Sequence, residues 1–239
     1  MSITLDCDIS VLEAYGEVLP LIEDSEDLAI KVMRKIQDAS YTYDDILNIF
    51  NKGVREISGK AYLPELEVVR DIDTDPSYSY VHAPADYQKN LRYAHSIDYN
   101  YPIKVYGSLA QLYSKLSMLD QSGRVIGIAV KGRRIYYQRI PDEAETIRVN
   151  YYSYPERMRA RYEKPTCIPD HLVEPLLINY ACSEIYSEIE DGMEGQKVNT
   201  TYYEGKYKEA LADLIEFIGP EESIPVEMPF GLDWNAYIQ

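Results

Sequence analysis

The sequence predicts an α+β fold: a four-helix core from both chain ends, with an inserted β-rich domain and an extended C-terminal arm. Three patterns support this prediction. Apolar residues recur with helical spacing near both ends, the middle is rich in Val, Ile and Tyr between turn residues, and the last residues alternate apolar with other types. We expect N-terminal helices, β-rich insertion, C-terminal helices and arm to occupy 1–62, 63–162, 163–218 and 219–239.

Two helices are expected in the first part of the core. In residues 26–39, apolar side chains recur at every fourth position from Leu28, which places them on one helical face. Residues 43–60 repeat the pattern, and Asp44 or Asp45 can cap the start of this second helix. The connection between the helices is short, so we expect an antiparallel pair.

A tight hairpin is expected in the β-rich insertion. The β-prone runs 125–130 and 133–140 are separated by Lys131-Gly132, and two linking residues that end in Gly are typical of a hairpin turn. A further strand is expected over residues 147–154, where Val, Ile and Tyr again dominate.

Helical spacing returns in the last third of the chain. Residues 170–189 and 196–218 each place apolar residues on one face, and Gly219-Pro220 ends the second of these helices. A short helix with Ser108 as its N-cap is expected between strands of the insertion.

The final segment has the period of a strand, because apolar residues occupy every second position. These apolar residues are Ile224, Val226, Met228, Phe230, Leu232, Trp234, Ala236 and Ile238. Pro225 and Pro229 lie at intervening positions, so both missing N–H donors fall on one edge and the opposite edge keeps all its donors. The segment from Gly219 to Gln239 can span at most about 70 Å.

Two interpretations of this arm stay open. It is either an edge strand on the chain's own sheet, or an arm that adds to another subunit by β-augmentation or groove docking. The break at Gly219-Pro220 favours the second, because chain ends are loose unless they are tied down. Buried aromatic residues dominate interface energies, so the expected anchors of the arm are Phe230, Trp234 and Tyr237, together with Leu232.

The net charge of −16 argues against a protein that holds nucleic acid tightly. Such proteins need a basic surface to release counterions from phosphates, whereas residues 164–239 carry 15 acidic and 4 basic residues. The chain contains 24 Tyr against 3 Phe and 1 Trp, and a Tyr-rich surface suits contacts with other proteins.

Composition also bears on the compartment. No stretch approaches 18 apolar residues, so we expect no membrane-spanning helix and no membrane partner. The first residues carry Asp6 and Asp8 without a basic segment, which does not fit a secretory signal. The odd count of 3 Cys suggests reduced thiols in a cytosol-like compartment.

No motif indicates catalysis, so we expect no enzyme, no cofactor and no metal. Residues 71–75 imitate the start of a calcium loop, but Pro76 and His82 stand where that loop needs Gly and Glu. Phosphate-binding, dinucleotide-binding, zinc-protease and serine-hydrolase motifs are absent from the sequence. Asp170-His171 lies at a helix start, where we expect a capping role.

Basic and aromatic residues alternate in parts of the insertion, and two interpretations of this pattern stay open. They form either a contact surface for glycan or single-stranded nucleic acid, or a packed sheet whose Tyr rings are covered by Arg stems. The packed sheet is the favoured reading. The residues of the possible contact surface are Arg133, Arg134, Tyr136, Tyr137, Tyr151 and Tyr152.

Several runs in matching order resemble a known family. Residues 45–57 and 62–66, the hairpin at 129–138 and the helix at 169–182 resemble tailed-phage head-to-tail adaptor proteins, which are also called connector or head-completion proteins. The resemblance covers about residues 40–215, and none of its motifs is catalytic.

This resemblance implies a structural virion protein at the head-tail junction, assembled in the host cytoplasm. It implies a homo-oligomeric ring, usually of twelve copies, that docks beneath the portal protein and offers a platform to a downstream tail protein. DNA would pass through the lumen during genome ejection without sequence-specific binding. An extended C-terminal segment often holds the portal in this family, and acidic helices suit a lumen that repels DNA. Like-charge repulsion predicts a monomer or small oligomer in isolation, with ring formation templated by the portal.

Overall fold

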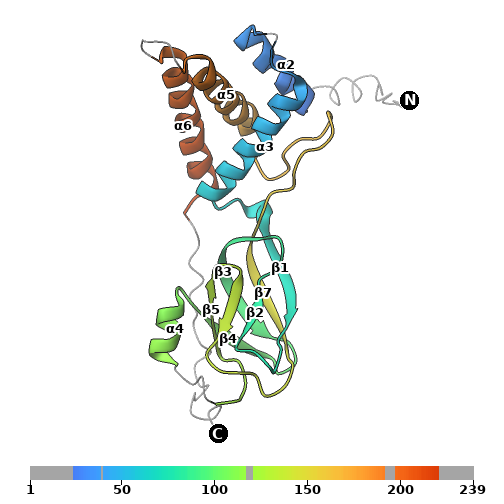
Figure 1. Cartoon of the computed structure of the whole chain (residues 1–239), viewed down its shortest axis with the longest axis vertical. Helices are drawn as coiled ribbons and strands as arrows, with labels where there is room; N and C mark the ends of the chain where they lie inside the picture. The colour runs from blue at the N-terminus through green and yellow to red at the C-terminus, as the bar shows by residue number, and fades with distance from the viewer. Residues whose placement is uncertain (1–23, 39, 117–120, 192–196, 221–239) are drawn as a thin grey trace, which may run out of the picture. The chain divides into compact units, whose positions relative to one another are not determined.

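The computed structural model describes residues 24–38, 40–116, 121–191 and 197–220. Its helices and curled seven-stranded sheet confirm the predicted α+β class (Figure 1). The four arm residues proposed as portal anchors lie outside the described residues.

The described chain divides into two compact units. The helical unit takes the chain as far as Val54 and again from Arg157 to Leu211. The β-unit takes Arg55–Glu156 together with the residues from Ala212 onward.

The four long helices match the four expected from the apolar period. They are α2 (Ser25–Ile36), α3 (Tyr43–Lys60), α5 (Asp170–Ile189) and α6 (Val198–Ile218). Helix α2 ends three residues before the predicted boundary, because Gln37 adopts a left-handed conformation with φ of 56° and its N–H donates to Met33 O at 3.0 Å. Gly219, with φ of 81°, ends α6 as predicted.

Two predicted helix caps are wrong. Thr42, rather than Asp44 or Asp45, caps α3: Asp45 N–H donates to Thr42 Oγ1 at 3.3 Å, and Thr42 N–H donates back to Asp45 Oδ2 at 3.0 Å. This reciprocal pair is a capping box, in which the acidic residue stands three positions after the cap. At the start of α5 the cap position is Pro169, which makes no side-chain hydrogen bond, so the expected capping role of Asp170-His171 is also wrong.

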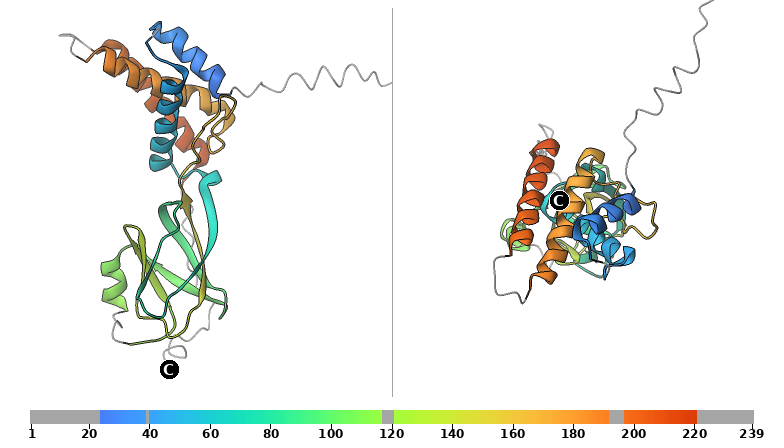
Figure 2. Two further views of the ribbon diagram at one scale, coloured as in Figure 1. Left: turned by 45° about the vertical axis from the view of Figure 1, so that its right-hand side comes forward. Right: turned by 90° about the horizontal axis from the view of Figure 1, so that it is seen from above.

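Helix α5 contacts the other helices of its unit. It packs against α2, and its Tyr180 ring meets the ring of Tyr207 on α6 with centroids 5.3 Å apart. Tyr186, six residues after Tyr180 on α5, stacks almost in parallel on Tyr203, four residues before Tyr207 on α6, with centroids 5.5 Å apart. Helices α5 and α6 therefore run side by side (Figure 2). A single core shared by all four helices stays a prediction.

The β-unit is a mixed sheet. Its strands are β1 (Glu67–Asp73), β2 (Tyr80–His82), β3 (Tyr87–Ser96), β4 (Tyr101–Tyr106), β5 (Gly127–Lys131), β6 (Arg134–Tyr137) and β7 (Thr146–Ser153). They lie in the order β1-β7-β3-β4-β5-β6-β2, and every neighbouring pair is antiparallel except β4 with β5. Parallel strands need a crossover connection, and helix α4 (Leu109–Lys115), capped by Ser108 as predicted, lies in it. The remaining element is a short 3-10 helix, η1 (Pro64–Leu66).

The predicted hairpin is formed by β5 and β6, with a turn displaced by one residue. Lys131 pairs with Arg134, so the two turn residues are Gly132 and Arg133 rather than Lys131 and Gly132. Gly132 has φ of 64° at the first central position, where a type II′ turn favours glycine.

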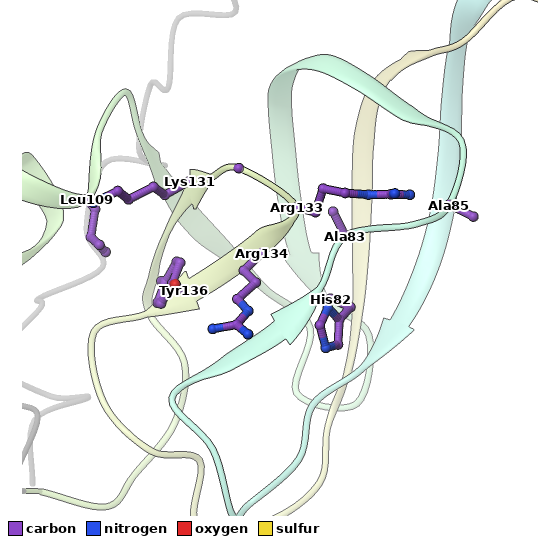
Figure 3. A pocket seen from close by; sticks show the side chains of 9 residues that line it. His82, Ala83, Ala85, Leu109, Lys131, Arg133, Arg134 and Tyr136 are labelled. Carbon is purple, nitrogen blue, oxygen red and sulfur yellow. The ribbon is translucent and has the colours of Figure 1, made fainter.

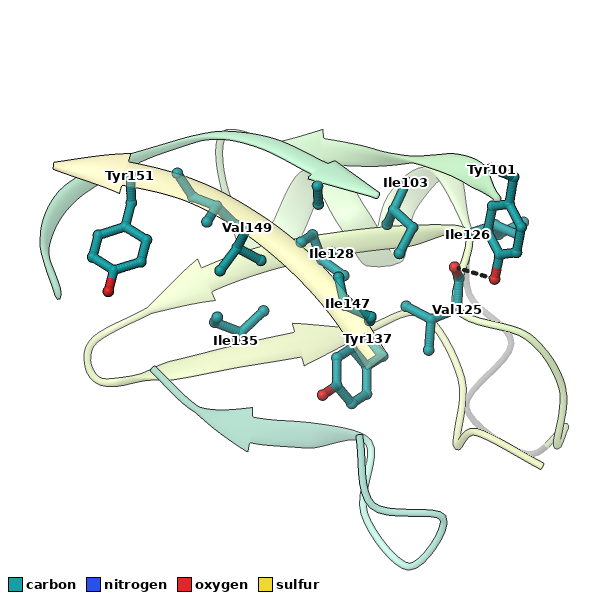
Figure 4. Close-up of a cluster of buried hydrophobic side chains, with 12 residues drawn as sticks. Tyr101, Ile103, Val125, Ile126, Ile128, Ile135, Tyr137, Ile147, Val149 and Tyr151 are labelled. Atoms are coloured by element: carbon teal, nitrogen blue, oxygen red, sulfur yellow. Dashed lines mark hydrogen bonds between the residues drawn. The ribbon is translucent and has the colours of Figure 1, made fainter. Parts of the chain in front are cut away.

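One face of the curled sheet encloses the core of the β-unit (Figure 4). Its fully buried side chains include Ile128, Ile135, Ile147, Val149, Tyr137 and Tyr151. Alternation along β6 is clear: Ile135 and Tyr137 point into the core, whereas Arg134 is exposed and Tyr136 half-buried.

A buried carboxylate stands at one end of this core. Glu145 is 3% exposed, and its Oε2 accepts hydrogen bonds from Ser96 Oγ at 2.8 Å and Tyr101 Oη at 3.2 Å. Its Oε1 accepts from the backbone N–H of Val125 at 3.1 Å, and its own backbone N–H donates to Thr74 Oγ1. A buried charge with this many donors is compensated, and it joins four segments of the sheet.

Candidate functional site: a basic groove beside strand β2

The outer face of the hairpin and of β2 gathers basic and aromatic side chains. Directly opposed residues in an antiparallel pair share a face, and the register sets Arg134 opposite both Lys131 and His82, with Tyr136 opposite Tyr80. The intervening residues, Ile135 among them, point into the core instead. Strand alternation therefore separates a basic-aromatic face from an apolar one.

This face forms one wall of a groove with a volume of about 660 Å³, which we call the basic groove (Figure 3). Its described lining residues include no acidic side chain. They are His82, Ala83, Ala85, Leu109, Lys131, Gly132, Arg133, Arg134 and Tyr136. A concentration of cations in a chain of net charge −16 makes this groove the candidate site for an anionic partner.

An aromatic ring packs against one cation of the basic groove, Arg134. The Arg134 guanidinium lies 4.5 Å from the centroid of the Tyr80 ring, within the range of a cation–π interaction. The Tyr80 ring lies 5.7 Å from that of Tyr136 and 6.1 Å from the imidazole of His82. Tyr78, which is 52% exposed, extends the ring cluster at 5.6 Å from Tyr80.

The same region carries a free sheet edge. Among the described strands, β2 is hydrogen-bonded to β6 alone. Ala83 N–H donates to Arg133 O at 3.0 Å, so the odd-numbered residues turn their backbone groups toward β6. Because backbone groups alternate along a strand, Tyr80 and His82 turn their N–H and C=O groups toward the opposite edge.

The predicted contact surface is only partly exposed, and this corrects the sequence-based proposal. Arg133 and Arg134 are exposed and Tyr136 is half-buried, and all three line the basic groove. Tyr137 and Tyr151 are fully buried in the core, and Tyr152 is 4% exposed. Three of the four tyrosines therefore cannot form an open stacking platform.

Two of the buried tyrosines, Tyr151 and Tyr152, have structural partners. Tyr151 Oη donates to Asp86 Oδ1 at 2.5 Å, and Tyr152 packs on the ring of Tyr62 with centroids 5.4 Å apart. Burial raises the pKa of the Tyr137 and Tyr151 hydroxyls above their usual range, so both stay neutral at physiological pH. These contacts agree with the packed-sheet alternative.

Most residues of the basic groove and its ring cluster were not predicted from the sequence, and these include Tyr80, His82, Leu109 and Lys131. β2 is three residues long and pairs with a strand more than fifty positions later, so no local period identifies it. The signal that was available is the alternation across the hairpin, which places Lys131 on the face of Arg134 once the turn residues are known.

In the described part of the chain, no three or more His, Cys, Asp or Glu side chains gather as a metal site would require. None of the helices described is both long and apolar enough to cross a membrane. Cys167 and Cys182 are buried, and burial raises the pKa of the Cys182 thiol to about 11.

The described part of the chain thus combines a helical unit, a β-unit and the basic groove. The model of one family, the SU10 adaptor protein, matches residues 24–223. The chain therefore belongs to the SU10 adaptor protein family, a family of phage head-tail adaptors, and it is a bacteriophage structural adaptor protein. No curated protein matches the chain.

Proposed function

We propose that this adaptor forms a ring beneath the portal of the filled capsid and provides the platform on which the tail attaches, with DNA passing through the lumen. The match of the family model over residues 24–223 carries the proposal, because head-tail adaptors join these two assemblies. Twelve copies per ring, assembly in the host cytoplasm, residence in the virion and a part in genome ejection belong to the same proposal.

Each part of the chain is assigned its own contact in the assembly. We assign residues 1–62 and 163–218 to the helical part that faces the portal, and 63–162 to the part that faces outward or tailward. The acidic C-terminal third supports passage of DNA, since 15 acidic against 4 basic residues repel phosphate instead of holding it.

The C-terminal arm, residues 219–239, is proposed to hold the portal. Its four anchors, Phe230, Leu232, Trp234 and Tyr237, are large apolar or aromatic side chains of the kind that dominate interface energies. Gly219 has φ of 81° and stops α6, so the arm starts at a defined break in the helix.

Electron microscopy of the chain mixed with the portal protein encoded near it tests this function. Rings of the chain that cap the portal are the expected result. Portal particles without added density at saturating chain concentration would contradict the proposal. The burial of Tyr137, Tyr151 and Tyr152 weighs against the alternative of a glycan or single-strand binding module.

A further inference from the structure

The outer edge of β2 fits a partner strand that is negatively charged and that offers backbone hydrogen-bonding groups along one side. Tyr80 and His82 present two N–H and two C=O groups at that edge, where no described strand pairs with them. The basic groove beside this edge holds Lys131, Arg133 and Arg134. β-augmentation satisfies such an edge through the backbone and obtains specificity from the side chains.

The chain contains a segment with these properties. Residues 221–228 have period two, three of the arm's four acidic residues and no basic residue. Pro225 removes a donor from one edge, while Ile224, Val226 and Met228 keep their donors on the other. A strand of this kind pairs along one side and ends the sheet with the other.

We propose that residues 221–228 of one copy add as a strand to the outer edge of β2 of a neighbouring copy. This interaction deepens the proposed function, on which it rests, by naming a contact that links adjacent subunits of the ring. It uses the first half of the arm and leaves the anchors from Phe230 onward for the portal.

Parallel pairing is the orientation that fits the charges. In a parallel pair, a residue whose backbone groups face the partner strand is level with a partner residue whose groups point away, and their side chains share a face. The even-numbered arm residues supply the donors, so the odd-numbered Glu221 and Glu227 lie on the face of Tyr80 and His82. That face also carries the Arg134 guanidinium, which leans over the Tyr80 ring.

Charge favours a neighbouring copy as the source of the strand. Copies of net charge −16 repel one another, and a contact between an acidic segment and a basic groove offsets that repulsion where the copies meet. The interaction is correspondingly expected to weaken as salt is added.

A complementation experiment with full-length chains tests the link. Arg134→Glu removes charge from the acceptor, and Val226→Pro removes a donor from the arm, so analytical ultracentrifugation at low salt should find each variant monomeric. Their equimolar mixture should form a 1:1 complex, because one variant keeps a working arm and the other a working groove. A mixture that stays monomeric while the wild type associates would overturn the proposal.

Two matched controls test whether the loss of association comes from the β2 edge itself or from a general effect of an added proline or a reversed charge. Ser223→Pro adds a proline on the edge that already lacks donors, so a chain with this change should associate like the wild type. Arg70→Glu reverses a charge on β1, the opposite edge strand of the sheet, and should also leave association unchanged. The assignment to β2 would be wrong if Ser223→Pro lost as much association as Val226→Pro. It would also be wrong if Arg70→Glu lost as much association as Arg134→Glu.

A labelled peptide of residues 219–229, titrated into the full-length Val226→Pro chain, tests the contact without any portal. Binding should weaken about tenfold when the peptide itself carries Val226→Pro, as expected for one lost hydrogen bond at a partly desolvated edge. If the peptide does not bind, or if a labelled oligo(dT) binds in its place and depends on Arg134, the proposal is wrong. Portal rings seen by microscopy alongside such a result would leave the proposed function standing.

Discussion

Gly53 on α3 lies against the ring of Tyr180 on α5, so closely that a Cβ at position 53 would stand 2.7 Å from Tyr180 Cδ1. Gly53→Ala should therefore force the helices apart or the ring out of position. We expect the free energy of unfolding to fall by about 1 to 3 kcal/mol, measured by chemical denaturation.

Gly205 on α6 provides the control for this prediction. A Cβ there meets nothing within 4 Å, so Gly205→Ala only reduces the freedom of the unfolded chain. This variant should gain about 0.5 to 1 kcal/mol in unfolding free energy. The close approach of α3 and α5 would be contradicted if both variants were stabilised alike.

Replacing Glu145 should destabilise the β-unit strongly. Glu145→Ala removes the acceptor of Ser96 Oγ and of Val125 N–H, whereas Tyr101 Oη keeps its hydrogen bond to Val125 O. Buried donors that lose their partner are costly, so we expect a loss of about 2 to 4 kcal/mol. Thermal unfolding followed by circular dichroism measures it. Glu143, an exposed neighbour that accepts from Tyr99 Oη, gives the comparison, and Glu143→Ala should change stability by less than about 0.5 kcal/mol.

The start of α6 should be sensitive to acid through Glu190. Its carboxylate accepts hydrogen bonds from Thr200 Oγ1 at 2.7 Å and from the backbone N–H groups of Thr200 and Asn199. The Thr200 hydrogen bonds hold the pKa of Glu190 below its ordinary value of 4.5. A lowered folded-state pKa means stability that is complete above the ordinary value and is lost as pH falls through the lowered one.

The measurement is the melting temperature of the wild type and of Glu190→Gln against pH. The wild type should melt higher at neutral pH, and the difference should shrink as the pH falls below 4.5 and the carboxylate takes up its proton. Thr200→Val should reduce the same difference, since it removes the shortest of the hydrogen bonds. A gap that stays constant as the pH is lowered until the carboxylate is protonated would show that the cap is not responsible.

Removing the arm should separate folding from portal binding. A chain that ends at Gly219 should keep the circular dichroism spectrum and melting temperature of the full chain, because every described helix and strand is retained. It should no longer co-sediment with portal particles. Full-length Trp234→Ala is expected to weaken co-sedimentation in the same direction, whereas retained binding by the truncated chain would refute the role of the arm.

The periodic elements were predictable from the sequence because their apolar residues are buried on one side. α3 has the predicted bounds of 43–60, and β7 is displaced by one residue from the predicted 147–154. The predictions were wrong at some ends of the helices and strands, where single hydrogen bonds decide which residue begins or ends the element. Thr42 caps α3 through its reciprocal hydrogen bonds with Asp45. The spacing of these two residues is visible in the sequence, but the apolar period used for the prediction does not take it into account.

The site was harder to predict, because exposure in a sheet depends on what covers each face. Tyr151 and Tyr152 point to opposite faces of β7, and both are buried, because Tyr151 lies in the core of the β-unit and the Tyr62 ring packs on Tyr152. Tyr136 is only half-buried, although β6, like β7, lies one place from an edge of the sheet. Neither the position of β2 at the edge nor its pairing with β6 can be read from local composition.

Where the β-unit begins and ends, its two flanking strands are direct partners: Glu67 at the start of β1 pairs with Tyr152 near the end of β7. An inserted module whose first and last strands are adjacent occupies no more space along its host chain than a short loop does. Recombination can therefore exchange or resize this module without rerouting the polypeptide around it. This arrangement allows related chains to diversify the β-unit while the helical unit stays constant.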